Sequence, residues 1–459
     1  MTSKAVLSTT EQRAVISLAS LYALRMLGLF MVLPVMMLEG QQLAGATPEL
    51  LGLAMGVYGL TQALLQIPAG SLSDRIGRKP VIVGGLLIFA LGSAIAASAE
   101  SVYGVILGRA LQGGGAIASA IMALVTDLTR EENRMKAMAS IGASIGLSFS
   151  LALVLGPWLA GIGGLNAIFT LTAILALAGV VVTLLLIPNP APLPHRDSRA
   201  VLSEVRQQLG NRVLWPLNSG IFILHAVMVA IFVAIPLQLK QQGVMADQHS
   251  WVYLPVLLAA FVLMVPFIIV AEKRRKMKGV VLTGAMVIAA ALLLMAVAST
   301  LWQWVLLLLL YFWGFNLMEA SLPSWLSKVA PAGAKGSAMG IYSSMQFLGA
   351  FVGGSIGGWL LAQYGSASLF VALGLLMVFW AFIIWRTNAP QHLTSVRLAI
   401  RQCSDQQLQQ LMALPGVSEV SPLASEGAIY LKVSADAFDM QQATAIVNSA
   451  NGEQHGSQR

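Results

Sequence analysis

The feature that most constrains this chain is a series of apolar runs, each about 20 residues long, along most of its length. A run of that length can cross the hydrocarbon core of a bilayer as an α-helix. Lipid offers the backbone no hydrogen-bond partners, so a helix must satisfy its own polar groups. The runs predict twelve transmembrane helices, at residues 14–38, 49–69, 80–99, 102–126, 138–162, 165–187, 215–239, 249–270, 279–299, 301–325, 337–362 and 366–386.

The composition agrees with a membrane protein, since 57% of the 459 residues are hydrophobic and only 10% are charged. A soluble protein carries about a quarter charged residues. The single cysteine, Cys403, excludes an intramolecular disulfide and any all-cysteine metal site. The sequence has no Gly-Lys-Ser or Gly-Lys-Thr phosphate loop and no clustered catalytic set. We therefore expect neither a metal nor a cofactor, and we do not expect an enzyme.

The basic residues are distributed very unevenly along the chain. With the N-terminus placed in the cytoplasm, Arg25 and Arg109 lie inside spans and Lys240 lies outside, while the other 24 of the 27 Lys and Arg residues are cytoplasmic. This positive-inside bias predicts that both termini are cytoplasmic, which an even number of spans also requires. The net charge of +8 then reflects topology and contact with anionic membrane lipid, and we expect no nucleic-acid partner.

The spans fall into two halves that resemble each other. A shift of 198 residues places Asp74 on Glu272 and Arg78 on Lys276. Paired six-span halves predict a transporter whose site lies between them. We expect an N-terminal half at residues 1–187, a cytoplasmic linker at 188–214, a C-terminal half at 215–388, and a soluble cytoplasmic domain with a tail at 389–459.

The region after the last span reads as a small α+β domain. Alternating and helical apolar patterns predict strands at 395–400, 417–420 and 428–433, and helices at 405–414 and 440–449. The order βαββα is typical of a ferredoxin-like domain. Its edge strands could mediate self-association, whereas a passive appendage is the alternative.

One short stretch between the second and third spans concentrates charge and backbone freedom. It combines an acid, three bases and two glycines in eleven residues, and the motif residues are Gly70, Asp74, Arg75, Gly77, Arg78 and Lys79. Asp127 ends the fourth span and can pair with Arg78 in competition with Asp74. Simple topology signalling explains the bases, but it does not explain the acid and the glycines.

These residues carry a family resemblance, as do motifs in later spans. Arg109, Gln112 and Gly113 form a pattern in the fourth span, and the fifth span contains a glycine-proline motif made by Gly146, Gly156, Pro157 and Gly161. Over residues 10–388 the chain resembles the major facilitator superfamily, and within it the proton-coupled drug antiporters with twelve helices. The resemblance implies an all-α membrane protein of two six-helix halves, here with the ferredoxin-like domain added.

The resemblance also implies roles for these residues. In this family the charged stretch around Asp74 holds the two halves together in the outward-facing state, and we call its residues the latch motif. The candidate partner of Asp74 is the N-terminus of the eleventh helix near Ser337, where unpaired N–H groups attract a carboxylate. The motif with Gly156 and Pro157 implies antiport, although Ala152 and Ala160 replace two of its usual glycines.

Polar residues inside the spans are the candidates for proton coupling. Glu319 is the only carboxylate well inside a span, and Asn316 lies one turn before it. Burial can bring a carboxylic acid into the physiological range, so Glu319 is the first candidate for a proton carrier. The alternative is a fixed ion pair with Arg25, whose charge at mid-membrane depth requires a partner or water.

Two further titratable or charged residues leave open alternatives. His225 in the seventh span could titrate near neutral pH, or it could be a hydrogen-bonded packing residue. Arg109 and Gln112 could take part in proton transfer, as the resemblance implies, or Arg109 could bond carbonyls of neighbouring helices. The first, fourth, seventh and tenth helices line the cavity in the family, and these residues fall on them.

Aromatic residues within the spans are candidates for a substrate pocket, chiefly Tyr58, Trp313 and Tyr342. The prediction is a proton-coupled antiporter that exports a small drug-like compound or metabolite. The alternatives are a proton symporter or uniporter that imports a nutrient such as a sugar, and a sensor whose output is the soluble domain. The identity of the substrate depends on the site and not on the fold.

Overall fold

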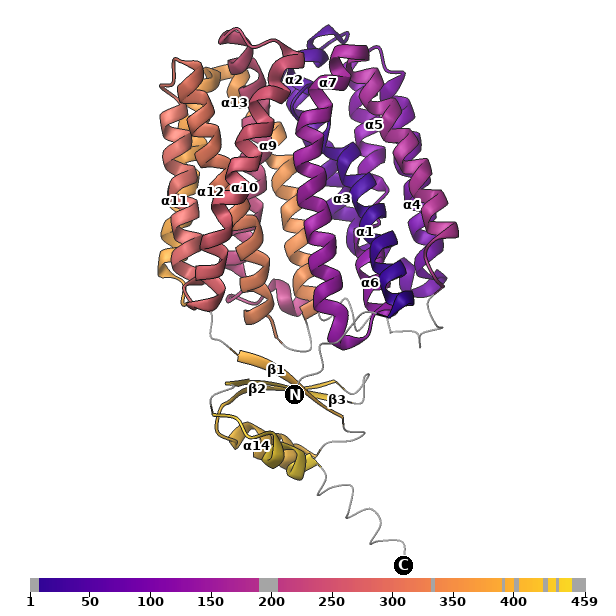
Figure 1. Ribbon diagram of the computed structural model, residues 1–459, viewed down its shortest axis with the longest axis vertical. Helices are drawn as coiled ribbons and strands as arrows, with labels where there is room; N and C mark the ends of the chain where they lie inside the picture. The colour runs from indigo at the N-terminus through magenta and orange to yellow at the C-terminus, as the bar shows by residue number, and fades with distance from the viewer. Residues whose placement is uncertain are drawn as a thin grey trace, which may run out of the picture.

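The computed structural model describes residues 8–189, 205–331, 335–389, 393–399, 404–423, 428–434 and 437–447. Two groups of long helices stand side by side, and a small domain of strands and helices lies beyond one end of them (Figure 1). We call that end the domain side and the opposite end the far side. Cys403 lies outside the described residues.

The first group of helices comes from the N-terminal half. Three of its helices start at hydroxyl caps, because the side chains of Ser8, Thr47 and Ser101 accept hydrogen bonds from backbone N–H groups that have no partner inside the helix. Its elements are α1 (Thr9–Phe30), α2 (Met36–Glu39), η1 (Gly40–Gln42), α3 (Pro48–Ile76), α4 (Arg78–Ala97), α5 (Val102–Gly114), α6 (Ala118–Leu128) and α7 (Glu131–Leu185).

The second group comes from the C-terminal half and begins after a short helical segment at residues 205–209. Thr300 caps its longest uninterrupted helix, and the Gln303 side chain bonds back to the Thr300 backbone. The elements are α9 (Trp215–Gln241), η2 (Ala246–Gln248), α10 (His249–Lys273), α11 (Met277–Met295), α12 (Leu301–Val329) and α13 (Lys335–Arg386).

The predicted twelve crossings are confirmed, although the helices are joined differently. Within the described residues, 10 helices are long and apolar enough to cross a membrane, and two of these have 50 and 52 residues. A helix of about 50 residues would be about 75 Å long, more than twice the thickness of the hydrocarbon core. Glycines with positive φ reverse both: Gly164 (φ 58°) within α7 and Gly365 (φ 76°) within α13. Each of these long helices therefore makes two crossings.

The first and fourth spans differ from the prediction because neither is a continuous helix. α1 ends at Phe30, and a turn at residues 31–35 precedes α2. Pro34 lies in this turn and has no N–H to donate to a helix. The fourth span breaks between Gly114 and Ala118, after three consecutive glycines that weaken a helix. Such a break frees backbone carbonyls inside the bundle for side-chain donors.

The sequence indicated a loop at the latch motif. The structure instead shows two helix ends joined by one residue. α3 continues through Asp74 to Ile76, and α4 begins at Arg78. Gly77 between them has φ 97° and ψ 155°, a conformation that only glycine adopts readily. The two helices therefore meet at a very tight turn, which brings the ends of α3 and α4 together.

The soluble domain confirms the predicted order of strands and helices. It contains β1 (Leu393–Ala399), α14 (Asp405–Ala413), β2 (Val417–Leu423), β3 (Ala428–Ser434) and a helix at residues 440–447. The antiparallel sheet has the order β1-β3-β2, as in the ferredoxin-like arrangement. Lys432 on β3 pairs with Glu419 and donates a hydrogen bond to the backbone oxygen of Lys328 on α12 at 3.2 Å. The domain is thus in contact with the second group of helices.

Candidate functional site

The two groups of helices are packed tightly against each other at the far side. Gly52, Gly56 and Gly59 of α3 lie against the backbone of α13, where an added Cβ would overlap the carbonyl oxygens of Gly354, Phe351 and Phe347. Small residues of this kind allow the backbones of membrane helices to approach closely. This interface closes the far side between α3 and α13.

Polar contacts add to the closure at the far side. The Ser250 hydroxyl at the start of α10 donates to the Val154 backbone oxygen of α7 at 2.7 Å. The Gln363 amide of α13 donates to the Glu49 carboxylate of α3 at 3.3 Å. Both hydrogen bonds connect the N-terminal half to the C-terminal half.

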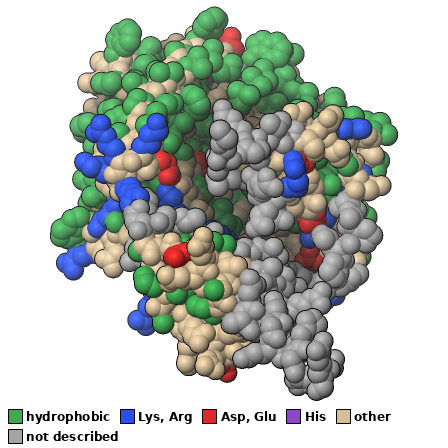
Figure 2. All heavy atoms as spheres, turned by 60° about the horizontal axis from the view of Figure 1, so that its bottom comes forward, with side chains coloured by type: hydrophobic (Ala, Val, Ile, Leu, Met, Phe, Trp, Pro, Cys, Tyr) green, Lys and Arg blue, Asp and Glu red, His purple; other side chains and the backbone are tan. Residues whose placement is uncertain are grey.

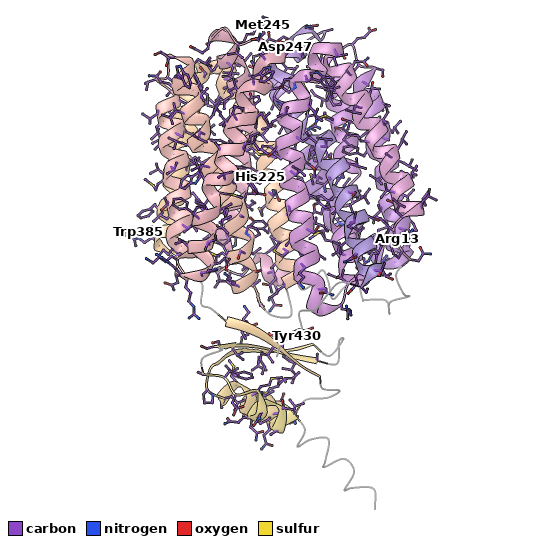
Figure 3. The ribbon with its side chains drawn as sticks, in the orientation of Figure 1. Arg13, His225, Met245, Asp247, Trp385 and Tyr430 are labelled. Carbon is purple, nitrogen blue, oxygen red and sulfur yellow. The ribbon has the colours of Figure 1, made fainter. Side chains whose placement is uncertain are left out.

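Glu39 at the end of α2 also faces the other half. Burial raises the pKa of the Glu39 carboxyl, while the positive charge of Lys240 at the end of α9 opposes that rise. Lys240 is the basic residue that the sequence places alone on the outer side. Asp247 lies nearby in the connection between α9 and α10, at the top of Figure 3.

At the domain side, four glycines of α7 and α13 face open space. An added Cβ would meet nothing within 4 Å at Gly142 and Gly146 of α7, nor at Gly336 and Gly340 of α13. The domain-side face is hollowed between the two groups of helices (Figure 2). The structure is therefore open at the domain side and closed at the far side.

A polar group of three side chains from three helices lies in the C-terminal half. The amide nitrogen of Gln346 on α13 lies 2.8 Å from His225 Nε2 of α9 and donates to Glu319 Oε1 of α12 at 3.3 Å. Glu319 Oε2 lies 3.8 Å from His225 Nε2. Figure 3 shows His225 at mid-height in the helical part. Gln346 thus joins the two titratable candidates into one network.

The hydrogen bonds define the protonation pattern of this network. His225 Nδ1 lies 3.3 Å from the Ile221 backbone oxygen and donates to it, which leaves Nε2 of a neutral imidazole to accept from Gln346. The second N–H of the Gln346 amide then donates a hydrogen bond to Glu319. The Glu319 side chain is 36% exposed, but its Oε2 is buried and accepts no hydrogen bond within the described chain.

Aromatic side chains lie near Glu319, among them Tyr311 and Tyr342. The hydroxyls of Tyr311 and Tyr342 are buried without a hydrogen-bond partner in the described chain. Phe315 lies next to His225, with ring centroids 5.9 Å apart, and stacks on Phe149 from the other half at 6.0 Å. The site therefore combines one carboxylate with unsatisfied hydroxyl donors and an apolar wall.

Arg25 belongs to a separate network in the N-terminal half, and the alternative of a pair with Glu319 is wrong. Its Nη2 donates to the Tyr58 hydroxyl at 2.9 Å, to Gln62 at 2.7 Å and to the Gly115 backbone oxygen at 3.1 Å. Gly115 lies in the break between α5 and α6. The guanidinium thus satisfies a carbonyl that the broken helix frees.

Arg109 bonds backbone carbonyls of a neighbouring helix, which was the alternative to a role in proton transfer, and so holds α5 against α3. Its Nε and Nη2 donate to the backbone oxygens of Ala54 and Met55 at 3.2 and 3.3 Å. Nη1 donates to Gln112, and the Gln112 amide donates to the Ser93 hydroxyl of α4. These contacts connect three helices and contain no carboxylate.

The latch motif forms a network inside the N-terminal half. Arg78 donates to Asp127 at 3.1 Å and to the Ser73 hydroxyl at 2.7 Å, and it also pairs with Asp74. The Arg78 side chain is only 14% exposed. The partners of Arg78 that the structure shows here, Asp127, Ser73 and Asp74, all belong to the N-terminal half, and the contact of Asp74 with the helix start near Ser337 stays a prediction.

The residues of the predicted antiporter motif lie along α7. Gly156 packs against the Met31 backbone at the break after α1, and Pro157 follows it inside the helix. Gly161 lies against Asp247, whereas Gly146 faces open space. The glycines nearer the far side therefore permit close contact, and the one nearer the domain side does not.

The predicted pocket aromatics separate into different environments. Tyr342 lies near Glu319, and the Tyr58 hydroxyl accepts a hydrogen bond from Arg25. Trp313 is not a pocket residue, because its Nε1 donates to the Leu263 backbone oxygen of α10 and its ring contacts Phe267. Asn316 is half-buried one turn before Glu319, and its side chain forms no hydrogen bond within the described residues.

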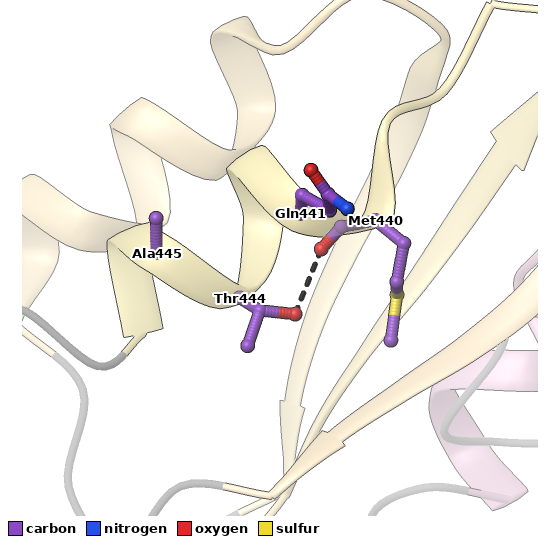
Figure 4. A pocket seen from close by; sticks show the side chains of 4 residues that line it. All are labelled: Met440, Gln441, Thr444 and Ala445. Carbon is purple, nitrogen blue, oxygen red and sulfur yellow. Dashed lines mark hydrogen bonds between the residues drawn. The ribbon is translucent and has the colours of Figure 1, made fainter.

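The described part of the soluble domain has two shallow depressions, one beside Leu408, Met412 and Val420 and one on the helix at residues 440–447. Met440, Gln441, Thr444 and Ala445 line the latter, and Thr444 donates to the Met440 backbone oxygen at 2.7 Å (Figure 4). These four side chains come from one helical surface and include no titratable group. The polar network around Glu319 is therefore the better candidate site.

The sequence analysis missed two groups of functional interest. Gln346 is uncharged and lies 27 residues from Glu319 and 121 from His225, so only the fold brings it to them. Glu11 accepts hydrogen bonds from the Arg130 side chain and backbone and from Asn133, which fastens the start of α1 to the start of α7. The sequence offered one sign of its importance, the capping-box spacing of Glu11 with Ser8 at the start of α1.

Comparisons with known proteins agree with this architecture. Residues 18–354 match the model of the Major Facilitator Superfamily. The chain is 46% identical to the "Inner membrane transport protein YajR" of Escherichia coli (strain K12), over 94% of this chain and 97% of that protein. It belongs to the Major Facilitator Superfamily. It is accordingly a secondary transporter and a multi-pass protein of the inner membrane.

More distant members of the superfamily share the fold with this chain. It is 30% identical to "Multidrug resistance protein MdtH" of Aeromonas salmonicida (strain A449), over 74% of this chain and 85% of that protein. The crystal structure of a D-xylose-proton symporter covers 83% of this chain and 98% of its own, with a TM-score of 0.65 and 17% identity.

Proposed function

We propose that this facilitator is a proton-coupled antiporter that exports a small drug-like compound or metabolite by alternating access. The observation that carries the proposal is the Glu319–Gln346–His225 network, in which a partly exposed carboxylate with one buried, unpaired oxygen lies between apolar helices. The relative named as a multidrug resistance protein supports the drug-like substrate class.

The physical basis of the coupling is the energy of a charge in a closing site. An ionised Glu319 in a site that closes on both sides would lose its water and would be strongly unfavourable. A proton removes that charge, and a bound substrate can cover it. If the site closes only in these two conditions, proton and substrate cross in alternation, which is antiport.

We also propose that the domain side is cytoplasmic, which makes this the inward-open state. The excess of Lys and Arg in the segments at that side supports the orientation. In the opposite state Asp74 would contact the start of α13. The Arg78 network would keep the ends of α3, α4 and α6 in the position that this contact requires. We further propose that the domains of the chain end at residues 187, 214 and 388. The soluble domain would mediate self-association.

Transport by the purified protein in liposomes tests the proposed function. We expect ethidium or Hoechst 33342 to move against its gradient when a pH gradient is imposed, with protons moving in the opposite direction. Glu319→Gln should reduce pH-driven transport at least 10-fold, because the site can no longer exchange a proton. Glu272→Gln on the surface is the control and should transport normally.

A measurement without substrate covers the case in which neither dye is a substrate. Spin labels at Gly142 and Gly340 report the opening at the domain side, after replacement of Cys403 by serine. The population of the open state should change with pH in the wild type and not in Glu319→Gln. Unchanged pH dependence in that variant would eliminate Glu319 as the proton carrier, and movement of dye and proton in the same direction would indicate symport.

A further inference from the structure

Five basic side chains lie within six consecutive residues at the connection of α10 and α11. They are Lys273, Arg274, Arg275, Lys276 and Lys278, and we call them the basic turn. The first four are exposed. They lie where two apolar helices end at the domain side, so they are at the level of the lipid head groups if these helices span a bilayer.

The acid next to the basic turn is already used within the protein. Glu272 accepts hydrogen bonds from Lys328 and from the Ser324 hydroxyl, both at 2.7 Å. Within the described residues, Arg274 and Lys276 form no ion pair. The positive charge of these two residues is therefore left for a partner outside the chain.

An aromatic platform lies beside the basic turn at the end of α13. Trp385 is 57% exposed, and the Arg386 guanidinium lies 5.6 Å from its ring centroid and 5.1 Å from that of Phe382. Lys278 donates to the Trp385 backbone oxygen at 2.8 Å and so fixes the basic turn to this platform. Figure 3 places Trp385 at the outer edge of the helices near the domain side.

The neighbouring surface of α13 provides room for acyl chains. Phe379, Phe382 and Trp385 are all exposed, and their spacing of three residues places them on one face of the helix. A ligand that combines an anionic head group with an apolar tail matches the basic turn and this face together. A free anion would use only the first of these features.

We propose that the basic turn, with Arg386 and Trp385, binds the phosphate group of an anionic phospholipid. This site is independent of the proposed transport function, because Glu319 and its partners take no part in it. Arg274 and Lys276 contact the phosphate, and the aromatic face of α13 contacts the acyl chains. Juxtamembrane bases of this kind attract anionic lipid, each by about a fivefold increase in affinity.

Native mass spectrometry of the delipidated full-length protein, titrated with phosphatidylglycerol, tests the site. The variant Arg274→Gln/Lys276→Gln should bind phosphatidylglycerol about 30-fold more weakly, from about fivefold for each base removed. The charge-retaining variant Arg274→Lys/Lys276→Arg should bind as the wild type does. All replaced side chains are exposed, so the variants should elute as monodisperse protein.

The matched control is Arg206→Gln/Arg212→Gln, which removes two exposed bases from the linker region. It should change the affinity less than twofold. An equal loss in this control would overturn the proposal in favour of general charge attraction. Equal binding of phosphatidylethanolamine, or complete competition by millimolar inorganic phosphate, would overturn it as well, since the site would then not select an anionic lipid.

Discussion

The two related turns of the molecule, α3–α4 and α10–α11, use similar residues in different ways. In the first turn, Arg78 is almost buried and is bonded by Asp127, Ser73 and Asp74 within its own half. In the second turn, Lys276 occupies the equivalent position and is exposed. The residue 198 positions after Asp127 is Trp325. Its indole cannot accept a hydrogen bond from a Lys or Arg side chain.

The backbone is also more tightly specified in the first turn than in the second. Gly77 has φ 97° and ψ 155°, where a side chain is strongly disfavoured, whereas Arg275 has φ 57°, a left-handed helical value that other residues can adopt. The first turn is therefore specified by buried contacts and by a unique backbone. The second turn retains charge without those constraints, which leaves Arg274 and Lys276 available for an external partner.

The largest contrast is expected from removing the central base of each turn. Arg78→Ala leaves the Asp74 and Asp127 carboxylates half-buried without a counter-charge, and we expect a loss of about 3 kcal/mol in the free energy of unfolding. Lys276→Ala should change it by less than about 0.5 kcal/mol, because an exposed base has no such partner. Reversible unfolding in mixed micelles measures both, and equal losses would show that burial does not distinguish the turns.

A smaller contrast is expected from the backbones. Gly77→Ala should lower the free energy of unfolding by about 2 kcal/mol, since its φ and ψ are almost restricted to glycine. The added Cβ would meet only the Pro80 ring, at 3.5 Å from Cδ and 3.9 Å from Cγ, which are ordinary contacts, so the loss would come from the backbone. Arg275→Ala serves as the comparison and should cost less than about 1 kcal/mol. A harmless Gly77→Ala would contradict this account of the first turn.

The smallest effect concerns the acid of the second turn. Glu272 is 43% exposed and pairs with Lys328, so Glu272→Gln should destabilise the protein by about 0.5 kcal/mol or less. The small difference should vanish in 1 M salt, because exposed pairs are screened. Thermal unfolding at low and high salt checks this, and a loss that persists at high salt would mean that the pair is not a surface interaction.

Much of the fold could be predicted from local pattern. The twelve crossings followed from run length, and the soluble domain followed from the alternation of apolar residues, within a few residues of the observed strands. The breaks at residues 31–35 and 115–117 could not be read from hydropathy, since apolar residues continue through them. They matter for the site because the second break exposes the Gly115 carbonyl to Arg25.

The candidate site was predictable only in part. Asp127 and Arg78 were expected as a pair, and the structure contains that pair. Glu319 was expected to have Arg25 as its alternative partner, but the two belong to networks in different halves. A buried charge requires compensation, and the sequence shows that requirement without showing which of several polar groups meets it.

The sequence by itself determined the membrane-spanning class, the pairing of the two halves and the family, because these depend on run length and on motifs along the chain. Only the tertiary structure decided that Gln346 joins His225 to Glu319 and that Trp313 faces α10. It also decided that the protein is closed at the far side and open at the domain side. Such features depend on contacts between helices distant in sequence, and the direction of each side chain around its helix selects those contacts.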